Sequence, residues 1–68
     1  MEVIEIKNNK ATVYYNGKYY CVSDNGEETL IFNSNSSGKI LDWTDVGGAK
    51  EVSLHEVLND FSRFIYNW

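Results

Sequence analysis

The sequence predicts an α+β fold in which an antiparallel meander sheet of about five strands carries one C-terminal α-helix on one face. Two observations support this prediction. Short runs of β-branched and aromatic residues, separated by Asn and Gly, fill residues 2–46. Beyond residue 53, apolar residues recur at steps of three and four, which is the spacing of one helical stripe. A chain of 68 residues has material for one core, so we expect a single domain spanning residues 1–68.

Two tight turns define the first three strands, which we expect at residues 2–7, 10–15 and 18–23. The pairs Asn8-Asn9 and Asn16-Gly17 tolerate the positive φ that a two-residue hairpin turn requires. These turns place Tyr14 opposite both Tyr19 and Val3. The register assigns to a core face Ile4, Ile6, Ala11, Val13, Tyr20 and Val22. The opposite face receives Val3, Glu5, Lys7, Thr12, Tyr14, Tyr19 and Cys21.

Two further strands are expected at residues 28–32 and 39–46, joined by the polar loop 33–38. Consecutive elements joined by short loops usually pair, so these strands should extend the meander. Alternation puts Leu30 and Phe32 on one side of the fourth strand, and Leu41 and Trp43 on one side of the fifth. The opposite parity, with Ile31 and Ile40 facing the core, stays open. A hairpin with its Trp in the core would explain this pattern.

The helix is expected at residues 54–66. Ser53, followed three residues later by Glu56, is a capping box that satisfies free amides at a helix start. The apolar stripe consists of Leu54, Val57, Leu58, Phe61, Phe64, Ile65 and Trp68. The sheet is the only large apolar surface available to this stripe, so the helix should pack on it.

The residue inventory favours a protein without enzymatic activity, metal or cofactor. One Cys and one His are too few for a structural zinc site. The fragment His55-Glu56 lacks the second His that a metalloprotease helix needs four residues after the first, where Asn59 stands. Cys21 is expected to be a small half-buried hydrophobe rather than a nucleophile. We therefore predict no catalytic or metal-binding residue.

The net charge of −4 is unevenly distributed. Residues 1–23 carry two acidic and three basic side chains, whereas residues 24–68 carry eight acidic and three basic ones. Binding of duplex DNA requires a basic stripe that releases counterions, so direct duplex binding is not expected. No stretch approaches the ~20 apolar residues that span a bilayer, and the N-terminus lacks a secretion signal. The expected location is the cytoplasm, with no membrane partner.

Two surfaces are candidate protein-binding sites, and the sequence does not choose between them. The first is the face that carries Val3, Tyr14 and Tyr19, which is either an exposed interface or a face covered by the later strands. The second is an acidic flank, which either engages a basic site on another protein or simply keeps the chain soluble. Its candidate residues are Asp24, Glu27, Glu28, Asp42 and Asp45.

The segment Glu28-Thr29-Leu30-Ile31-Phe32, a short polar loop, and Gly38-Lys39-Ile40-Leu41-Asp42-Trp43-Thr44-Asp45-Val46 resemble a pattern in small, mostly uncharacterised proteins of bacteriophages and prophages. A closing helix that ends in a Trp, here Trp68, is similar too. No catalytic residues belong to this pattern. The resemblance implies a phage-encoded module that binds and modulates or inhibits a host protein, such as a defence nuclease or another nucleic-acid-binding protein, in the host cytoplasm.

Two alternatives remain beside the protein-binding module. A sheet with exposed Tyr14 and Tyr19 could stack the bases of single-stranded nucleic acid. The chain could instead form a homo-oligomer as a self-associating structural component.

Overall fold

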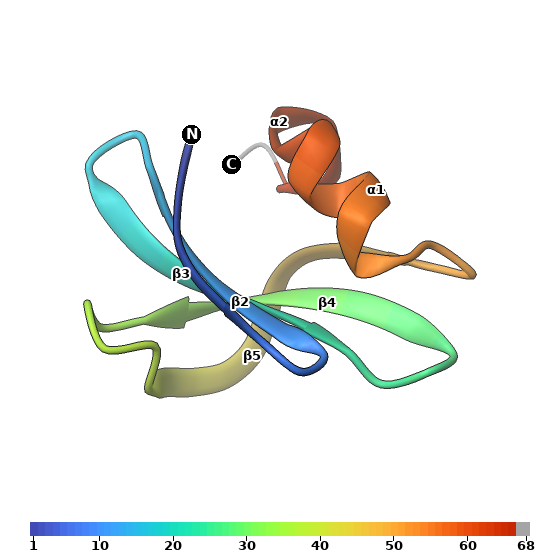
Figure 1. The fold of residues 1–68 in the computed structure, drawn as a ribbon, viewed down its shortest axis with the longest axis horizontal. Helices are drawn as coiled ribbons and strands as arrows, with labels where there is room; N and C mark the ends of the chain where they lie inside the picture. The colour runs from blue at the N-terminus through green and yellow to red at the C-terminus, as the bar shows by residue number, and fades with distance from the viewer. Residues whose placement is uncertain (67–68) are drawn as a thin grey trace.

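The computed structural model describes residues 1–66 and contains one five-stranded antiparallel sheet with two short helices. The strands follow one another across the sheet in chain order, so each pairs with its neighbours in sequence (Figure 1). The predicted α+β meander is confirmed. The elements are β1 Glu2–Lys7, β2 Lys10–Tyr15, β3 Lys18–Asp24, β4 Glu28–Ser34, β5 Ile40–Lys50, α1 Leu54–Asn59 and α2 Phe61–Phe64.

The hairpin of β2 and β3 has the predicted register. Tyr14 pairs with Tyr19 and Val13 pairs with Tyr20 across the ladder. Asn16 and Gly17 form the turn with φ of 52° and 86°, which is the left-handed backbone that Asn and Gly adopt most readily. The side chains of this hairpin therefore alternate between the two faces as expected.

The register predicted for β1 is wrong beyond its first pairs. Ile6 pairs with Ala11 as expected, but a β-bulge between Val3 and Glu5 leaves Ile4 as the extra residue. Val3 consequently pairs with Val13. β1 is an edge strand and is exposed along its whole length, with Ile4 at 44% and Ile6 at 51%, so neither side chain belongs to the buried core. Little packing holds the register of such a strand.

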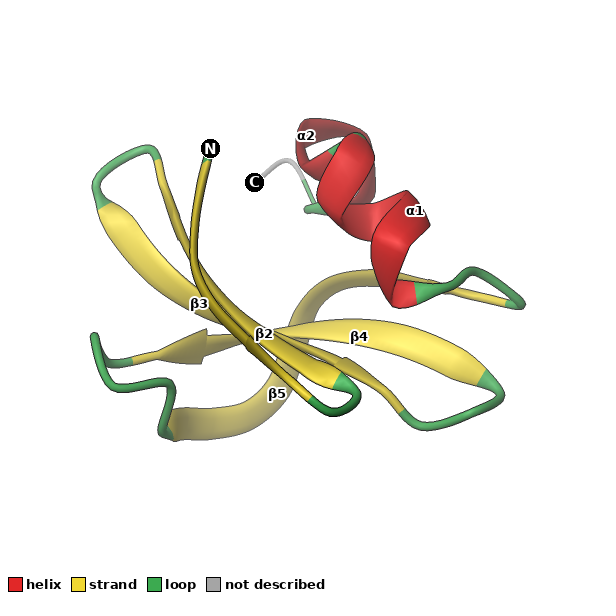
Figure 2. Ribbon diagram, in the orientation of Figure 1, coloured by secondary structure: helices red, strands yellow, loops and turns green. Residues whose placement is uncertain are grey.

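The open parity of β4 is decided by its pairing with β3. Val22 pairs with Ile31, and both side chains are fully buried on the side of the sheet that carries the helices. Phe32 pairs with Cys21, so Leu30 and Phe32 point to the other side, which we call the outer face. Figure 2 shows both helices on one side of the sheet.

β5 continues to Lys50, past its predicted end at residue 46. Gly47 and Gly48, which follow the predicted strand end, lie inside this strand and pair with Ile31 and Leu30. A Cβ on Gly47 would lie 2.6 Å from the carbonyl oxygen of Phe64 and 2.8 Å from Cα of Ile65. The glycine therefore allows the chain that follows the helices to cross directly against β5.

The predicted single helix over residues 54–66 is wrong, because the chain turns at Asp60, where φ is −146° and ψ is 52°. The turn brings Ile65 into an isolated bridge with Gly47, and the Tyr66 amide donates to the Val46 carbonyl at 2.8 Å. A straight helix could not make these contacts with β5. No helix within residues 1–66 is long and apolar enough to cross a membrane. Trp68, the last member of the predicted stripe, lies outside the described residues.

The start of the helical segment follows the prediction. The Ser53 side chain accepts a hydrogen bond from the Glu56 amide at 3.2 Å, which is the expected capping contact. Asp24 supports the same helix end, because its Oδ2 accepts from the Leu54 amide at 3.3 Å. Both contacts fix where α1 begins.

The core lies between the helices and the sheet. Its buried members are Ala11, Val13, Tyr20, Val22, Ile31, Leu54, Val57 and Phe61. Phe61 is 3% exposed, and its ring packs in tilted geometry against Tyr15 at 5.0 Å and Tyr20 at 5.7 Å between ring centroids. This one side chain joins α2 to the β2–β3 hairpin.

We expect Phe61→Ala to lower the free energy of unfolding by about 3 to 5 kcal/mol, because it removes a buried aromatic ring and leaves a cavity between the sheet and the helices. Urea denaturation followed by circular dichroism measures the loss. Arg63→Ala, on the exposed side of α2, is the matched control and should change stability little. A loss under about 1 kcal/mol for Phe61→Ala would contradict the docking of α2 on the hairpin.

We expect Gly47→Ala to destabilise the protein by about 1 to 3 kcal/mol, since the new methyl group would collide with the Phe64 carbonyl and the Ile65 backbone. Gly26→Ala is the comparison, because that glycine has a φ of 94° but no atom within 4 Å of the position that its methyl group would take. It reports the cost of backbone strain alone. Thermal melts of both variants separate the two effects, and an unchanged Gly47→Ala melt would argue against the close crossing at β5.

Candidate functional site

The structure brings the two candidate tyrosines together on the outer face. Tyr14 and Tyr19 are cross-strand partners, and their ring centroids lie 4.9 Å apart with an interplanar angle of 57°. Tyr14 is 39% exposed and Tyr19 is partly exposed. Val3 does not join them, because the bulge in β1 pairs it with Val13, whose side chain faces the helices. The placement of Val3 beside Tyr14 is therefore wrong.

Part of the outer face is covered by the loop between β4 and β5. Thr12 and Cys21 are 7% and 2% exposed. A Cβ on Gly38 would collide with the Thr12 hydroxyl, so the loop backbone lies directly on this part of the sheet. Asn35 holds the loop in shape, because its Oδ1 accepts from the amides of Ser37 and Lys39. The sequence leaves open whether this face is covered or exposed. It is covered around Thr12 and Cys21 and exposed at Tyr14.

A tryptophan that sequence reasoning placed in the core is the most exposed large apolar side chain of the described residues. Trp43 is 73% exposed and Leu41 is 63% exposed. The β4–β5 ladder jumps from the pair of Phe32 with Asp45 to that of Ser34 with Ile40, so residues 41–44 bulge away from β4. The Trp43 and Phe32 rings pack edge to face, with 5.4 Å between their centroids. The expected buried Trp is wrong.

A local signal for this bulge was present in the sequence. The Asp42 side chain accepts a hydrogen bond from the Thr44 amide at 2.9 Å, which is the turn that Asp forms with its own backbone. The pattern Asp42-Trp43-Thr44-Asp45 therefore marks a turn as well as a strand. Alternation alone gave no reason to prefer the turn.

We call the aromatic side chains grouped on this face the outer aromatic surface: Tyr14, Tyr19, Trp43, and Phe32, which lies beneath Trp43 and is only 6% exposed. Phe32 stands on the strand next to Tyr19, diagonal to it across the β3–β4 ladder, and Trp43 packs on Phe32. The nearby charges have both signs, because Glu5 and Lys10 pair with residues of the outer face and Asp42 precedes Trp43. The result is an aromatic patch with a mixed polar rim.

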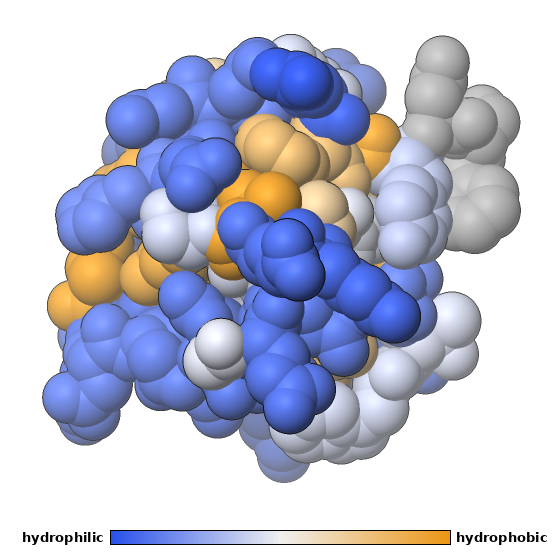
Figure 3. All heavy atoms as spheres, turned by 90° about the vertical axis from the view of Figure 1, so that its right-hand side faces the viewer, coloured by the Kyte–Doolittle hydropathy of each residue, from blue (hydrophilic) through white to orange (hydrophobic). Residues whose placement is uncertain are grey.

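The acidic candidates fall in two places on the fold. Glu27 and Glu28 lie with Asp24 at the β3–β4 turn, and the Glu51 amide donates to the Glu27 carbonyl at 2.9 Å, which adds Glu51 to this end. Figure 3 views the molecule from the side on which this turn and α1 lie. Most of this side is hydrophilic, with apolar side chains visible in patches. Asp42 and Asp45 instead lie in β5, where Asp42 directly precedes Trp43 of the outer aromatic surface.

Three of the acidic candidates accept hydrogen bonds through their side chains: Asp42 from Thr44, and also Asp24 and Asp45. Asp24 accepts from the Gly26 amide at 2.8 Å through Oδ1 and from the Leu54 amide through Oδ2, so its carboxylate stabilises a turn and a helix start. Asp45 accepts from the Tyr66 hydroxyl at 3.1 Å, and this hydrogen bond raises the pKa of that phenol. Of the acidic candidates at the β3–β4 turn, Glu27 is the exposed one, whereas Asp24 and Glu28 are half-buried.

The described residues contain no group of three His, Cys, Asp or Glu side chains that could hold a metal ion. His55 is exposed on α1. Cys21 is a free thiol under the β4–β5 loop, and its burial raises its pKa despite the opposing charge of Lys10. A thiol in this state is a poor nucleophile at neutral pH.

The chain matches no protein-family model, no curated protein and no solved structure.

We expect the Cys21 thiol to titrate above its ordinary pKa of about 8.5 in the folded protein, and near that value in urea. Because the folded-state pKa is the higher one, the thiol's contribution to stability is fully present below the unfolded-state pKa and is lost as the pH rises through the folded-state value. Thiolate absorbance measured against pH, with Cys21→Ala as the blank, tests this. A folded-state pKa below the ordinary value would instead indicate a reactive cysteine.

Proposed function

We propose that this chain is a small acidic, non-enzymatic module that binds a protein through the outer aromatic surface. The observation that supports it best is Trp43, an aromatic side chain that is 73% exposed and held on a bulge beside Phe32. Residues that dominate the energetics of interfaces are enriched in Trp and Tyr. Monomeric proteins rarely leave such side chains grouped in water without a partner.

The partner in this proposal is a host protein, met in the host cytoplasm by a module of phage or mobile-element origin. The resemblance of residues 28–46 to small phage and prophage proteins supports the origin. The module would modulate or inhibit its partner by covering a functional surface of that protein, for example the active site of a defence nuclease or the binding surface of another nucleic-acid-binding protein. The exposed Glu27 and the neighbouring acids would favour approach to a basic partner through long-range attraction.

We expect Trp43→Ala to weaken partner binding at least about tenfold, because the ring is an exposed anchor. The unfolding midpoint should change little, since its only packed ring neighbour among the described residues is Phe32. Proteins captured from bacterial lysate on the wild-type chain would be quantified on Trp43→Ala, on Tyr14→Ala with Tyr19→Ala, and on Arg63→Ala as the matched surface control. Equal capture on wild type and Trp43→Ala would refute this interface, and selective loss on Glu27→Gln with Glu28→Gln would move it to the acidic flank.

Single-stranded nucleic acid is a second candidate ligand for the same surface. The tilted pair of Tyr14 and Tyr19 and the exposed Trp43 are aromatic platforms of the kind on which bases stack. Lys10 lies on that face as the partner of Ser23. Titration of protein fluorescence with oligonucleotides at low and moderate salt tests this candidate, and no binding at either salt would exclude it.

Self-association is a third proposal, supported by β1. This edge strand has one side without a strand partner in the described sheet and exposes Val3, Ile4 and Ile6 at 41% to 51%. Sedimentation over a range of protein concentrations distinguishes a homo-oligomer from a monomer.

A further inference from the structure

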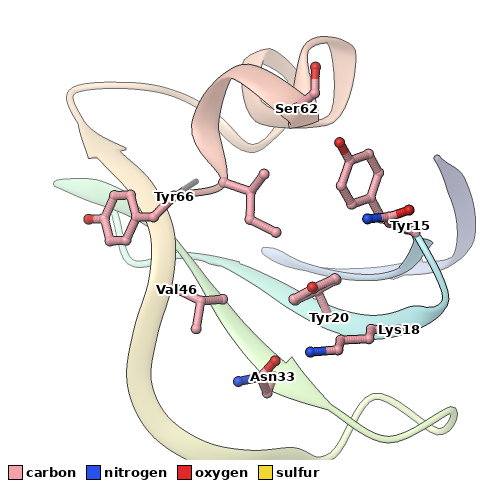
Figure 4. Close-up of a pocket in the computed structure, with 9 residues that line it drawn as sticks. Tyr15, Lys18, Tyr20, Asn33, Val46, Ser62 and Tyr66 are labelled. Carbon is pink, nitrogen blue, oxygen red and sulfur yellow. The ribbon is translucent and has the colours of Figure 1, made fainter. Parts of the chain in front are cut away.

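A cleft lies on the helix side of the sheet, on the opposite side from the outer aromatic surface. Its volume is about 500 Å³, within the range of clefts that hold small molecules. Figure 4 shows Tyr15, Lys18 and Tyr20 of the β2–β3 hairpin on one side of it, Val46 and Tyr66 on the other, and Ser62 of α2 above. Asn33, at the end of β4, forms its floor in this view. Four separate parts of the chain therefore build the cleft: the β2–β3 hairpin, β4, β5 and the segment around α2.

Most polar side chains of the cleft have no partner within the described part of the protein. No hydrogen bond or ion pair engages the side chains of Tyr15, Lys18, Tyr20, Asn33 and Ser62. In the same region, the Asp45 carboxylate already binds the Tyr66 hydroxyl. The unengaged groups all carry N–H or O–H donors, which can serve a bound molecule.

Tyr20 gives the sharpest indication that the cleft receives a polar ligand. The residue is only 8% exposed, yet no buried side-chain oxygen or nitrogen of residues 1–66 lacks a partner. Its unpaired hydroxyl is therefore not fully buried, and Tyr20 is one of the residues that line the cleft. Burial raises the pKa of this phenol, so it remains a hydrogen-bond donor at neutral pH.

The charge of the cleft is opposite to that of the molecule. The whole chain carries −4, but among the described residues that line the cleft Lys18 is the sole charged one, and none of them is Asp or Glu. Figure 4 shows the Lys18 side chain directed toward Asn33. An ammonium group beside amide and hydroxyl donors suits an anion with several acceptor oxygens. Val46 and Ile65 supply an apolar wall for the rest of the ligand.

We propose that this cleft binds a small phosphate monoester of mononucleotide size, with the phosphate at Lys18 and Asn33 and the organic body against Val46 and Ile65. Phosphate fits better than carboxylate, because its three terminal oxygens can use more of the unpaired donors. This site is separate from the outer aromatic surface, so either can exist without the other.

The test uses adenosine monophosphate as the probe, added to the ¹⁵N-labelled chain and followed by chemical-shift changes. We expect saturable shifts at the amides of residues 15–20, 33 and 62, and weaker binding of both adenosine and inorganic phosphate. Lys18→Gln should weaken binding at least about tenfold, which corresponds to loss of a charge-assisted contact. Lys7→Gln, the same change of charge on β1, should leave the affinity as it is.

Several outcomes would overturn the proposal. They are the absence of saturable shifts at millimolar probe, adenosine or inorganic phosphate binding as tightly as the nucleotide, and equal affinity of Lys18→Gln and wild type. Tyr20→Phe keeps the buried ring and removes the hydroxyl, so it provides a second variant if Lys18→Gln fails to fold. If Tyr20→Phe melts at the wild-type temperature, its affinity for adenosine monophosphate should fall. An unchanged affinity would contradict a contact between the Tyr20 hydroxyl and the ligand.

Discussion

The packing of Phe61 against Tyr15 and Tyr20 is the contact on which the other features of this protein depend. The chain is long enough to cover one face of its sheet, and Phe61 fixes which face that is. With α1 and α2 held there, the opposite face meets water wherever the β4–β5 loop does not cover it. The same docking positions α2 over the β2–β3 hairpin and leaves the cleft of Figure 4 between them.

Elements determined by neighbouring residues could be predicted from the sequence, whereas elements determined by distant contacts could not. The turn at Asn16-Gly17 and the cap at Ser53 are local, and both form as predicted. The break at Asp60 is different, because it accompanies contacts of Ile65 and Tyr66 with β5, which lies far away in sequence. For the same reason the strand end predicted at residue 46 is wrong, since the missing side chain of Gly47 allows a crossing that no local pattern reveals.

The candidate sites show the same division. Pairing of Tyr14 with Tyr19 follows from one hairpin turn and was predictable. The exposure of Trp43 depends on the bulge in β5 opposite β4. Alternation assigns a strand side chain to one face of a sheet, but it does not say whether anything covers that face. The cleft could not be foreseen at all, since its walls come from the hairpin, from β4 and β5, and from the segment around α2. Asp24 shows the converse, because a residue chosen for its charge is engaged in holding a turn and a helix start.

The order of the strands has a consequence for the kinetics of folding. Each strand of the meander finds its partner in the adjacent stretch of chain, so loop closure costs little entropy and hairpins can form on the microsecond scale. The contacts of α1 with β3 and of Ile65 with Gly47 span much longer separations. A transition state built from hairpins, with the helices still undocked, would therefore make substitutions in α1 and α2 accelerate unfolding far more than they slow folding.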